Sequence, residues 1–111
     1  MSDEIKKSLT DILNSINIIE EYLGSKRNFK DYEANRQLSD AVERRLEIIG
    51  EATNRILKID SAIKIAHARR IVDLRNKVIH AYDTVDHFTI WAVIINDLPI
   101  LKNEVTELLK F

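Results

Sequence analysis

The chain has no cysteine and few residues that interrupt helices, with two glycines and one proline among 111 residues. Without cysteine it forms neither disulfides nor thiolate metal sites. Its longest apolar run, residues 90–95, is far shorter than a membrane-spanning helix needs. The acidic start Ser2-Asp3-Glu4 is unlike a secretory signal peptide, so a cytoplasmic location is predicted. A net charge of −1 means that any binding site for a polyanion must be a local patch.

Apolar residues recur at helical spacing along nearly the whole chain, and no stretch shows the alternation of a strand. The spacing predicts helices over residues 2–23, about 31–58, 60–80 and from 86 toward the C-terminus. Asn28 is a candidate cap for a short turn before the second helix. Pro99 lies inside the fourth, where a kink or a fresh start capped by Asp97 is expected. Short connections predict one all-α domain over residues 1–111, an antiparallel four-helix bundle.

The same periodicity predicts which side chains are buried. In the fourth helix the expected core row begins Phe88, Trp91, Ile95 and Leu98. In the third it is Ile71, Leu74, Val78 and Ala81, which leaves Val72 and Ile79 on an exposed apolar flank. A partner surface would cover that flank, so a homodimer interface at Val72 and Ile79 is predicted.

The third helix also carries polar residues that a core does not need. Arg75, Asn76, His80 and Tyr82 lie within eight positions and have the chemistry to bind and cleave a phosphodiester. His80 can act as base or acid near neutral pH, and Arg75 can hold phosphate oxygens. The stretch 64–80 holds five lysines or arginines against one acid, a local balance of +4. Its further candidates for RNA phosphate contacts are Arg69, Arg70 and Lys77.

A solvated charged face is the ordinary explanation for such a helix. His67 and His87 are assigned structural or surface roles. No two histidines are four residues apart, so no His-based metal site is predicted. Glu51, beside Gly50 in the second helix, is the one acid there that stands out, and Gly50 predicts close approach by another helix.

The order Arg, Asn, three residues, His, one residue, Tyr resembles the Arg-x4-6-His motif of HEPN-domain ribonucleases, in the form found in HepT-type toxins. Residues 48–52 and 91–99 also resemble that family, whereas Asp73-Leu74 departs from the Gly-Met often found there. The resemblance implies a homodimeric toxin that cleaves RNA without metal or cofactor. It gives Arg75 and His80 the catalytic roles at the dimer cleft, with Asn76 in support. It also implies an MNT-type nucleotidyltransferase antitoxin that adds AMP to Tyr82.

Two other functions stay open on the sequence alone. One is a non-catalytic helical adaptor or substrate-binding subunit of a nucleotidyltransferase. The other is a purely structural bundle.

Overall fold

The computed structural model describes residues 1–67, 70–74 and 87–110, and all regular structure among them is helical. The elements are α1 (Asp3–Leu23), α2 (Phe29–Ala34), α3 (Arg36–Ile59), a helical stretch at residues 70–74, α5 (His87–Ala92), a π-helical turn (Val93–Asp97) and α6 (Leu98–Leu109). The predicted all-α class is confirmed. No helix in these described ranges combines the length and apolarity needed to cross a membrane.

Helix α1 has the bounds that its sequence predicts. The Ser2 side chain accepts a hydrogen bond from the Ile5 backbone N–H at 3.1 Å, as an N-cap does. The helix ends at Gly24, whose φ of 66° lies in the left-handed region that glycine adopts without steric cost.

The predicted single helix over residues 31–58 is wrong, because the chain breaks at Asn35. Asn35 is extended, with φ −103° and ψ 92°, and its side chain accepts the Leu38 N–H at 3.0 Å to begin α3. Asn28 caps α2 in the same way, through the Asp31 N–H at 3.2 Å, so the predicted turn there is a short helix. Two asparagine caps seven residues apart thus divide one expected helix into two.

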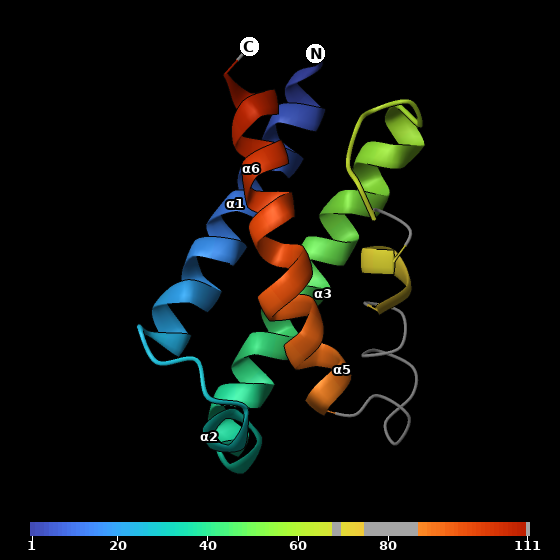
Figure 1. Cartoon of the computed structure of the whole chain (residues 1–111). Coiled ribbons are helices and arrows are strands. Elements are labelled where there is room, and N and C mark those ends of the chain that lie inside the picture. Colours follow the sequence, from blue (N-terminus) through green and yellow to red (C-terminus); the bar gives the residue numbers. More distant parts are fainter. Residues whose placement is uncertain (68–69, 75–86, 111) are drawn as a thin grey trace.

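Helix α1 packs against both α3 and α6. Figure 1 shows α1 antiparallel to these two, with both chain termini at the same end of the molecule. The chain leaves α3 at that end and enters α5 at the opposite end. The core between the helices is almost entirely aliphatic, and its fully buried members include Leu9, Ile12, Ile16, Ile19, Val42, Ile49, Ile56, Ile90, Leu101 and Val105.

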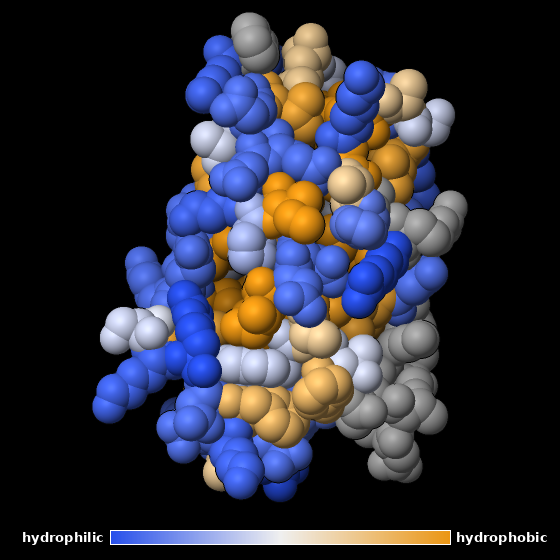
Figure 2. Space-filling model, viewed as in Figure 1, coloured by the Kyte–Doolittle hydropathy of each residue, from blue (hydrophilic) through white to orange (hydrophobic). Residues whose placement is uncertain are grey.

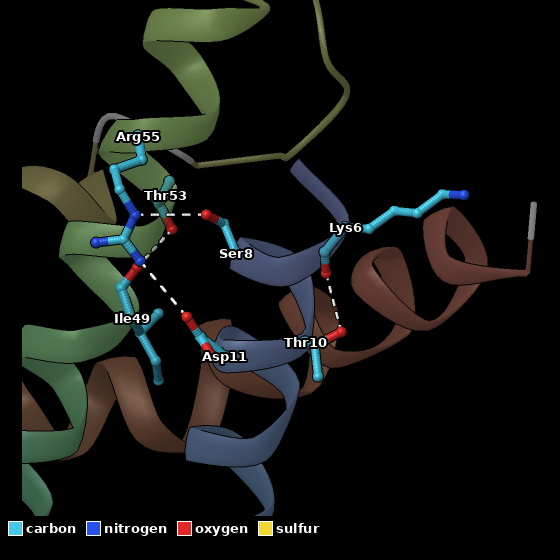
Figure 3. Close-up of polar contacts among 7 residues, drawn as sticks. All are labelled: Lys6, Ser8, Thr10, Asp11, Ile49, Thr53 and Arg55. Carbon is cyan, nitrogen blue, oxygen red and sulfur yellow. Dashed lines mark hydrogen bonds and ion pairs between the residues drawn. The ribbon is translucent and has the colours of Figure 1, made fainter. Parts of the chain in front are cut away.

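A small polar contact also joins α1 to α3. The Arg55 Nε donates to Ser8 Oγ at 3.4 Å, and its Nη2 lies 3.6 Å from Asp11 Oδ2 (Figure 3). Thr53 is buried beside them, and its hydroxyl donates a hydrogen bond to the Ile49 carbonyl of the same helix at 2.8 Å. On the other side of α1, Lys102 Nζ and Glu20 Oε1 are 2.6 Å apart and join α6 to α1.

The π-helical turn changes which residues of the last helical segment are buried. Phe88 and Ile95, both expected in the core, are 66% and 39% exposed. The Leu98 N–H bonds to the Val93 carbonyl, five residues back, so the turn holds one residue more than an α-helical turn. The buried positions are therefore Ile90 before the turn, and Val93 and Ile94 within it. Pro99, the second residue of α6, has no N–H to continue an α-helical ladder, which accounts for a change of helix at the place predicted.

Candidate active site

The segment that leads into the predicted catalytic stretch is attached to α6. The Ala66 backbone N–H donates to Glu104 Oε2 at 2.8 Å, across 38 positions of sequence. Ile65 is buried beside this contact. One carboxylate of α6 therefore fixes the position of the connection that follows α3.

The described residues 70–74 are helical, and His67 lies shortly before them. The His67 φ of 60° is in the left-handed region, which histidine enters more readily than most residues. The Ile71 N–H bonds to the His67 carbonyl at 3.0 Å and starts the helical ladder. Ile71 and Leu74 are both buried in the main core, as predicted. Ile71 and Leu74 therefore determine which face of this helix points toward the core, up to the residue before Arg75.

Arg70 makes the second attachment, to the π-helical turn. Its Nε lies 3.5 Å from Asp97 Oδ2, an ion pair between an arginine side chain that is 56% exposed and an aspartate that is only 6% exposed. Asp97 was expected to cap α6, but its side chain makes no capping hydrogen bond and instead meets Arg70. Asp97 and Glu104 are seven residues apart, about two helical turns, and hold residues 70 and 66 respectively.

Val72 corrects the prediction of an exposed apolar flank. It is only 6% exposed, although it is not part of the main core cluster. Within a single chain Val72 is therefore already covered, and it gives no reason to expect a partner there.

Of the predicted site residues, the described part of the chain includes only Arg70. Arg69, Arg75, Asn76, Lys77, His80 and Tyr82 lie outside the described residues, as do Val78, Ile79 and Ala81. Arg70 is partly exposed but engaged with Asp97, so its predicted contact with RNA stays a prediction. Among the described residues there is no group of three side chains able to hold a metal ion.

An aromatic cluster lies where the chain resumes after that stretch. His87 and Trp91 of α5 contact the Tyr32 ring, with centroids 5.9 and 5.2 Å away. Phe29 lies against both Phe88 and Trp91, with centroids at 5.5 and 6.2 Å. These contacts join α2 to α5, and of the structural or surface role predicted for His87 they show the structural one.

Burial governs the ionisable groups around this cluster. It raises the pKa of the Tyr32 phenol, and the Glu43 and Asp40 carboxylates raise it further. Burial also raises the pKa of Glu43; His87 opposes that change, while Asp40 and Glu47 add to it. Tyr32 therefore stays a neutral packing residue at ordinary pH, with no hydrogen bond to its hydroxyl in the described structure.

Sequence reasoning missed the two carboxylates that hold this segment. Asp97 was interpreted as a cap, and Glu104 was not singled out. A weak signal existed for both, since they share a face of the last helical segment with the core residues Leu101 and Val105.

Comparison with known proteins identifies a family whose model matches most of the chain. The family model for HepT-like ribonucleases matches residues 12–108. A Thermococcus cleftensis protein named "Probable ribonuclease HepT" is 36% identical over 109 residues, 95% of this chain and 96% of that protein. A Methanocaldococcus jannaschii protein named "Putative RNase" is 35% identical over 104 residues, 92% of this chain and 94% of that protein.

A second Methanocaldococcus jannaschii protein contains a related sequence in about half of its length. Named "Gamma-glutamylcyclotransferase and putative RNase", it is 36% identical over 112 residues, which cover 99% of this chain but half of that protein. No solved structure matches the chain.

Proposed function

Because the chain belongs to the HepT-like ribonuclease family, we propose that it is an RNA endonuclease whose active site contains Arg75 and His80. The observation that carries this proposal is the family match over residues 12–108, which includes the whole octet 75–82. The attachment of residues 66 and 70 to α6 and the π-helical turn supports it, because a catalytic helix needs a fixed entry.

The proposed chemistry uses the 2′-hydroxyl of RNA as the nucleophile. A base removes its proton, the 2′-oxygen attacks phosphorus, and the bond from phosphorus to the 5′-oxygen breaks as an acid protonates that oxygen. The products are a 2′,3′-cyclic phosphate and a 5′-hydroxyl. His80 serves in the proton transfers, and Arg75 stabilises the charge that develops on the phosphoryl oxygens. Asn76, Arg69, Arg70 and Lys77 support binding of the strand. No step requires a metal or a cofactor.

The proposed active unit is a homodimer of four-helix bundles. One histidine does not act as base and acid in the same step, whereas two copies related by a two-fold axis supply one neutral and one protonated imidazole. Ile79 remains a candidate for the interface, and Val72 does not.

The proposed biological role is that of a cytoplasmic toxin, neutralised by an MNT-type nucleotidyltransferase that adds AMP to Tyr82. This part of the proposal rests on the family resemblance of the octet. The competing function, a non-catalytic adaptor for such a nucleotidyltransferase, would keep the partner and lose the cleavage.

Cleavage of RNA in EDTA tests the activity. Purified protein, His80→Ala and Arg75→Ala are incubated with total RNA, and the 3′ ends of the products are read. We expect the parent to leave cyclic phosphates, and each variant to be slower by on the order of 10²–10⁴-fold while remaining folded. Full cleavage by folded His80→Ala would refute its role. No cleavage by the parent, combined with binding to the nucleotidyltransferase, would favour the adaptor.

A further inference from the structure

Asp97 is the only charged residue that is buried in the described part of the chain, with 5% of its surface exposed. Its Oδ2 accepts no hydrogen bond from the described residues and lies 3.5 Å from the Nε of Arg70. Burial of a carboxylate costs free energy, and a nearby cation offsets only part of that cost. An amide or apolar side chain at position 97 would avoid the cost altogether. Stability alone therefore explains the charge of Asp97 poorly.

Asp97 also lies at an irregular point of the last helical segment. It is the final residue of the π-helical turn that separates α5 from α6. Single π-helical turns are rare and often occur at functional sites. The Asp97 side chain makes no capping hydrogen bond to α6 and instead meets Arg70, which belongs to another part of the fold. The turn thus directs a buried charge toward the segment that precedes the octet.

Two carboxylates of the last helical segment hold the chain on both sides of His67, whose φ is 60°. Glu104 Oε2 accepts the Ala66 N–H at 2.8 Å, and Asp97 Oδ2 attracts Arg70. Both contacts join specific atoms, whereas apolar packing has no preferred direction. Apolar side chains reach the surface at several places along the molecule (Figure 2), so apolar contact alone does not mark one position for this segment.

The octet follows this segment directly, because Arg75 is bonded to Leu74. Ile71 and Leu74 are buried in the core and determine which face of the helical stretch points inward. The ion pair between Arg70 and Asp97 adds a fixed point at the start of that stretch. A displacement there is passed along the backbone to Arg75. A misplacement of about 1 Å can reduce the rate of a reaction by about 100-fold, even when the mutation is far from the reacting atoms.

We propose that Asp97 is a positioning residue of the ribonuclease, which fixes the start of the proposed catalytic stretch through its ion pair with Arg70. Glu104 has the same role through the Ala66 N–H. The inference rests on the proposed function, because it assigns both carboxylates to the cleavage by Arg75 and His80. Asp97 is buried and does not contact the RNA strand, so its loss lowers kcat and does not weaken binding of RNA.

Charge and position predict different effects of Asp97→Asn. The substitution removes a negative charge beside Arg70, which strengthens the attraction for RNA phosphates and lowers KM. A carboxylate that only moderated this attraction would therefore slow cleavage at low RNA concentration, and its removal would speed it. A carboxylate that positions Arg70 maintains kcat, and its removal lowers kcat without raising KM. Separate values of kcat and KM distinguish these two roles.

Cleavage of a short labelled RNA in EDTA, at concentrations below and above KM, gives both constants. The RNA carries a site at which the parent protein cuts total RNA. The variants are Asp97→Asn, Arg70→Ala and the two combined. Asp11→Asn is the matched control, because it removes the same charge from a carboxylate that lies 3.6 Å from another arginine, Arg55, between α1 and α3 (Figure 3). Urea unfolding establishes that each variant is folded under the assay conditions.

We expect Asp97→Asn to lower kcat by about ten- to 100-fold, the effect of a small displacement, with KM no higher than that of the parent. Asp11→Asn should keep the kcat of the parent. Arg70→Ala should lower kcat by a similar factor and also raise KM, because Arg70 is a candidate phosphate contact. The double variant should have the kcat of Arg70→Ala, since Asp97 acts through Arg70.

A second measurement does not depend on cleavage. The Ile71 N–H, next to Arg70, donates to the His67 carbonyl at 3.0 Å. Its hydrogen exchange should be faster in Asp97→Asn and unchanged in Asp11→Asn, because only the first variant loses the contact that holds Arg70. A parent that cuts no RNA would contradict the proposed function, and exchange at Ile71 would still decide whether Asp97 holds this segment.

Glu104 has a parallel test with a conservative variant. Glu104→Gln keeps an acceptor for the Ala66 N–H, whereas Glu104→Ala does not. Only the alanine variant should therefore have a lower kcat. Equal kcat values for the two variants would limit the positioning role to Asp97.

The inference about Asp97 is overturned by a parent that cuts RNA and an Asp97→Asn protein with the same kcat. It is also overturned by an equal loss of kcat in Asp11→Asn, or by losses for Asp97→Asn and Arg70→Ala that multiply in the double variant. Unchanged exchange at Ile71 in Asp97→Asn would overturn it whether or not the parent cuts RNA.

Discussion

Arg70 and Asp97 form an ion pair in which one partner is buried and the other is not: Nε and Oδ2 are 3.5 Å apart, with side-chain exposures of 56% and 6%. The contact is electrostatic, because Asp97 Oδ2 accepts no hydrogen bond within the described structure. A buried carboxylate depends on a nearby cation far more than an exposed arginine depends on an anion. The pair therefore couples the π-helical turn to the helical stretch at residues 70–74.

The unequal burial predicts unequal costs of mutation. Arg70→Ala leaves a buried carboxylate without its cation, and should lower the free energy of unfolding by about 1–3 kcal/mol. Asp97→Asn removes the charge and keeps the shape, so it should cost less than about 1 kcal/mol. Urea unfolding of both variants and of the double variant measures the difference. If the two single costs simply add in the double variant, the residues are not coupled.

Glu104 should contribute to stability as a hydrogen-bond acceptor, through Oε2, rather than through its charge. Glu104→Gln keeps an acceptor for the Ala66 N–H and should change stability little. Glu104→Ala removes the acceptor of an exposed hydrogen bond and should cost about 0.5–1.5 kcal/mol. Amide hydrogen exchange at Ala66 should speed up in the alanine variant alone.

Glu107 is the control on the same helix. It is exposed and paired with Lys110, three residues on, at 2.8 Å. Glu107→Ala should change stability by less than about 0.5 kcal/mol and leave Ala66 exchange unaltered. Protection of Ala66 in Glu104→Ala equal to the parent would show that this hydrogen bond does not hold the connection.

Local signals predicted the helices well where both ends are marked in the sequence. The Ser2 cap and Gly24 gave α1 its bounds, because a cap and a left-handed glycine act on their nearest neighbours. Asn35 is an equally good cap, yet the apolar periodicity continues through it, so one helix was predicted where two exist. When a capping residue lies inside a run of helically spaced apolar residues, only the structure, through its extended backbone, shows that it begins a new helix.

Contacts between distant positions were not predictable in this way. The exposure of Phe88 follows from the π-helical turn, which shifts the buried face of the helix by one residue. The spacing of apolar residues in the sequence does not reveal this turn. The contacts of Arg70 with Asp97 and of Ala66 with Glu104 join residues far apart in sequence. The octet itself was recognised from its residue types, which is a chemical signal that does not depend on the packing around it.

The raised pKa of Glu43 predicts a dependence of stability on pH. The folded state holds the Glu43 proton more tightly than the unfolded state, so ionisation of Glu43 opposes folding. This penalty is absent below the ordinary pKa of 4.5 and complete once the pH exceeds the raised value. Glu43→Gln should therefore stabilise the protein at pH 7, by less than about 1 kcal/mol because the side chain is only half-buried. The gain should vanish as the pH falls below about 4.5.

Unfolding in urea at pH 4 and pH 7 measures that gain. Glu21→Gln, at an exposed carboxyl on α1, is the control and should show no such difference. A Glu43→Gln protein equally stabilised at both values would mean that packing of the amide, rather than ionisation, is responsible.

Tyr82 is predicted to be the AMP acceptor and to be dispensable for cleavage. AMP there would add a phosphodiester anion and a nucleoside two residues from His80, where the anion can pair with Arg75 and the nucleoside can occupy the space that RNA needs. Tyr82→Phe should therefore cleave RNA at nearly the parent rate and escape inactivation by the nucleotidyltransferase. Mass spectrometry of protein co-expressed with that enzyme locates the adduct, and Tyr22→Phe, at an exposed tyrosine of α1, should still be modified and silenced. An adduct on another residue, or a Tyr82→Phe protein that the enzyme still silences by modification, would exclude Tyr82 as the acceptor. If Tyr82→Phe alters neither toxicity nor its neutralisation, the ring has only a packing role.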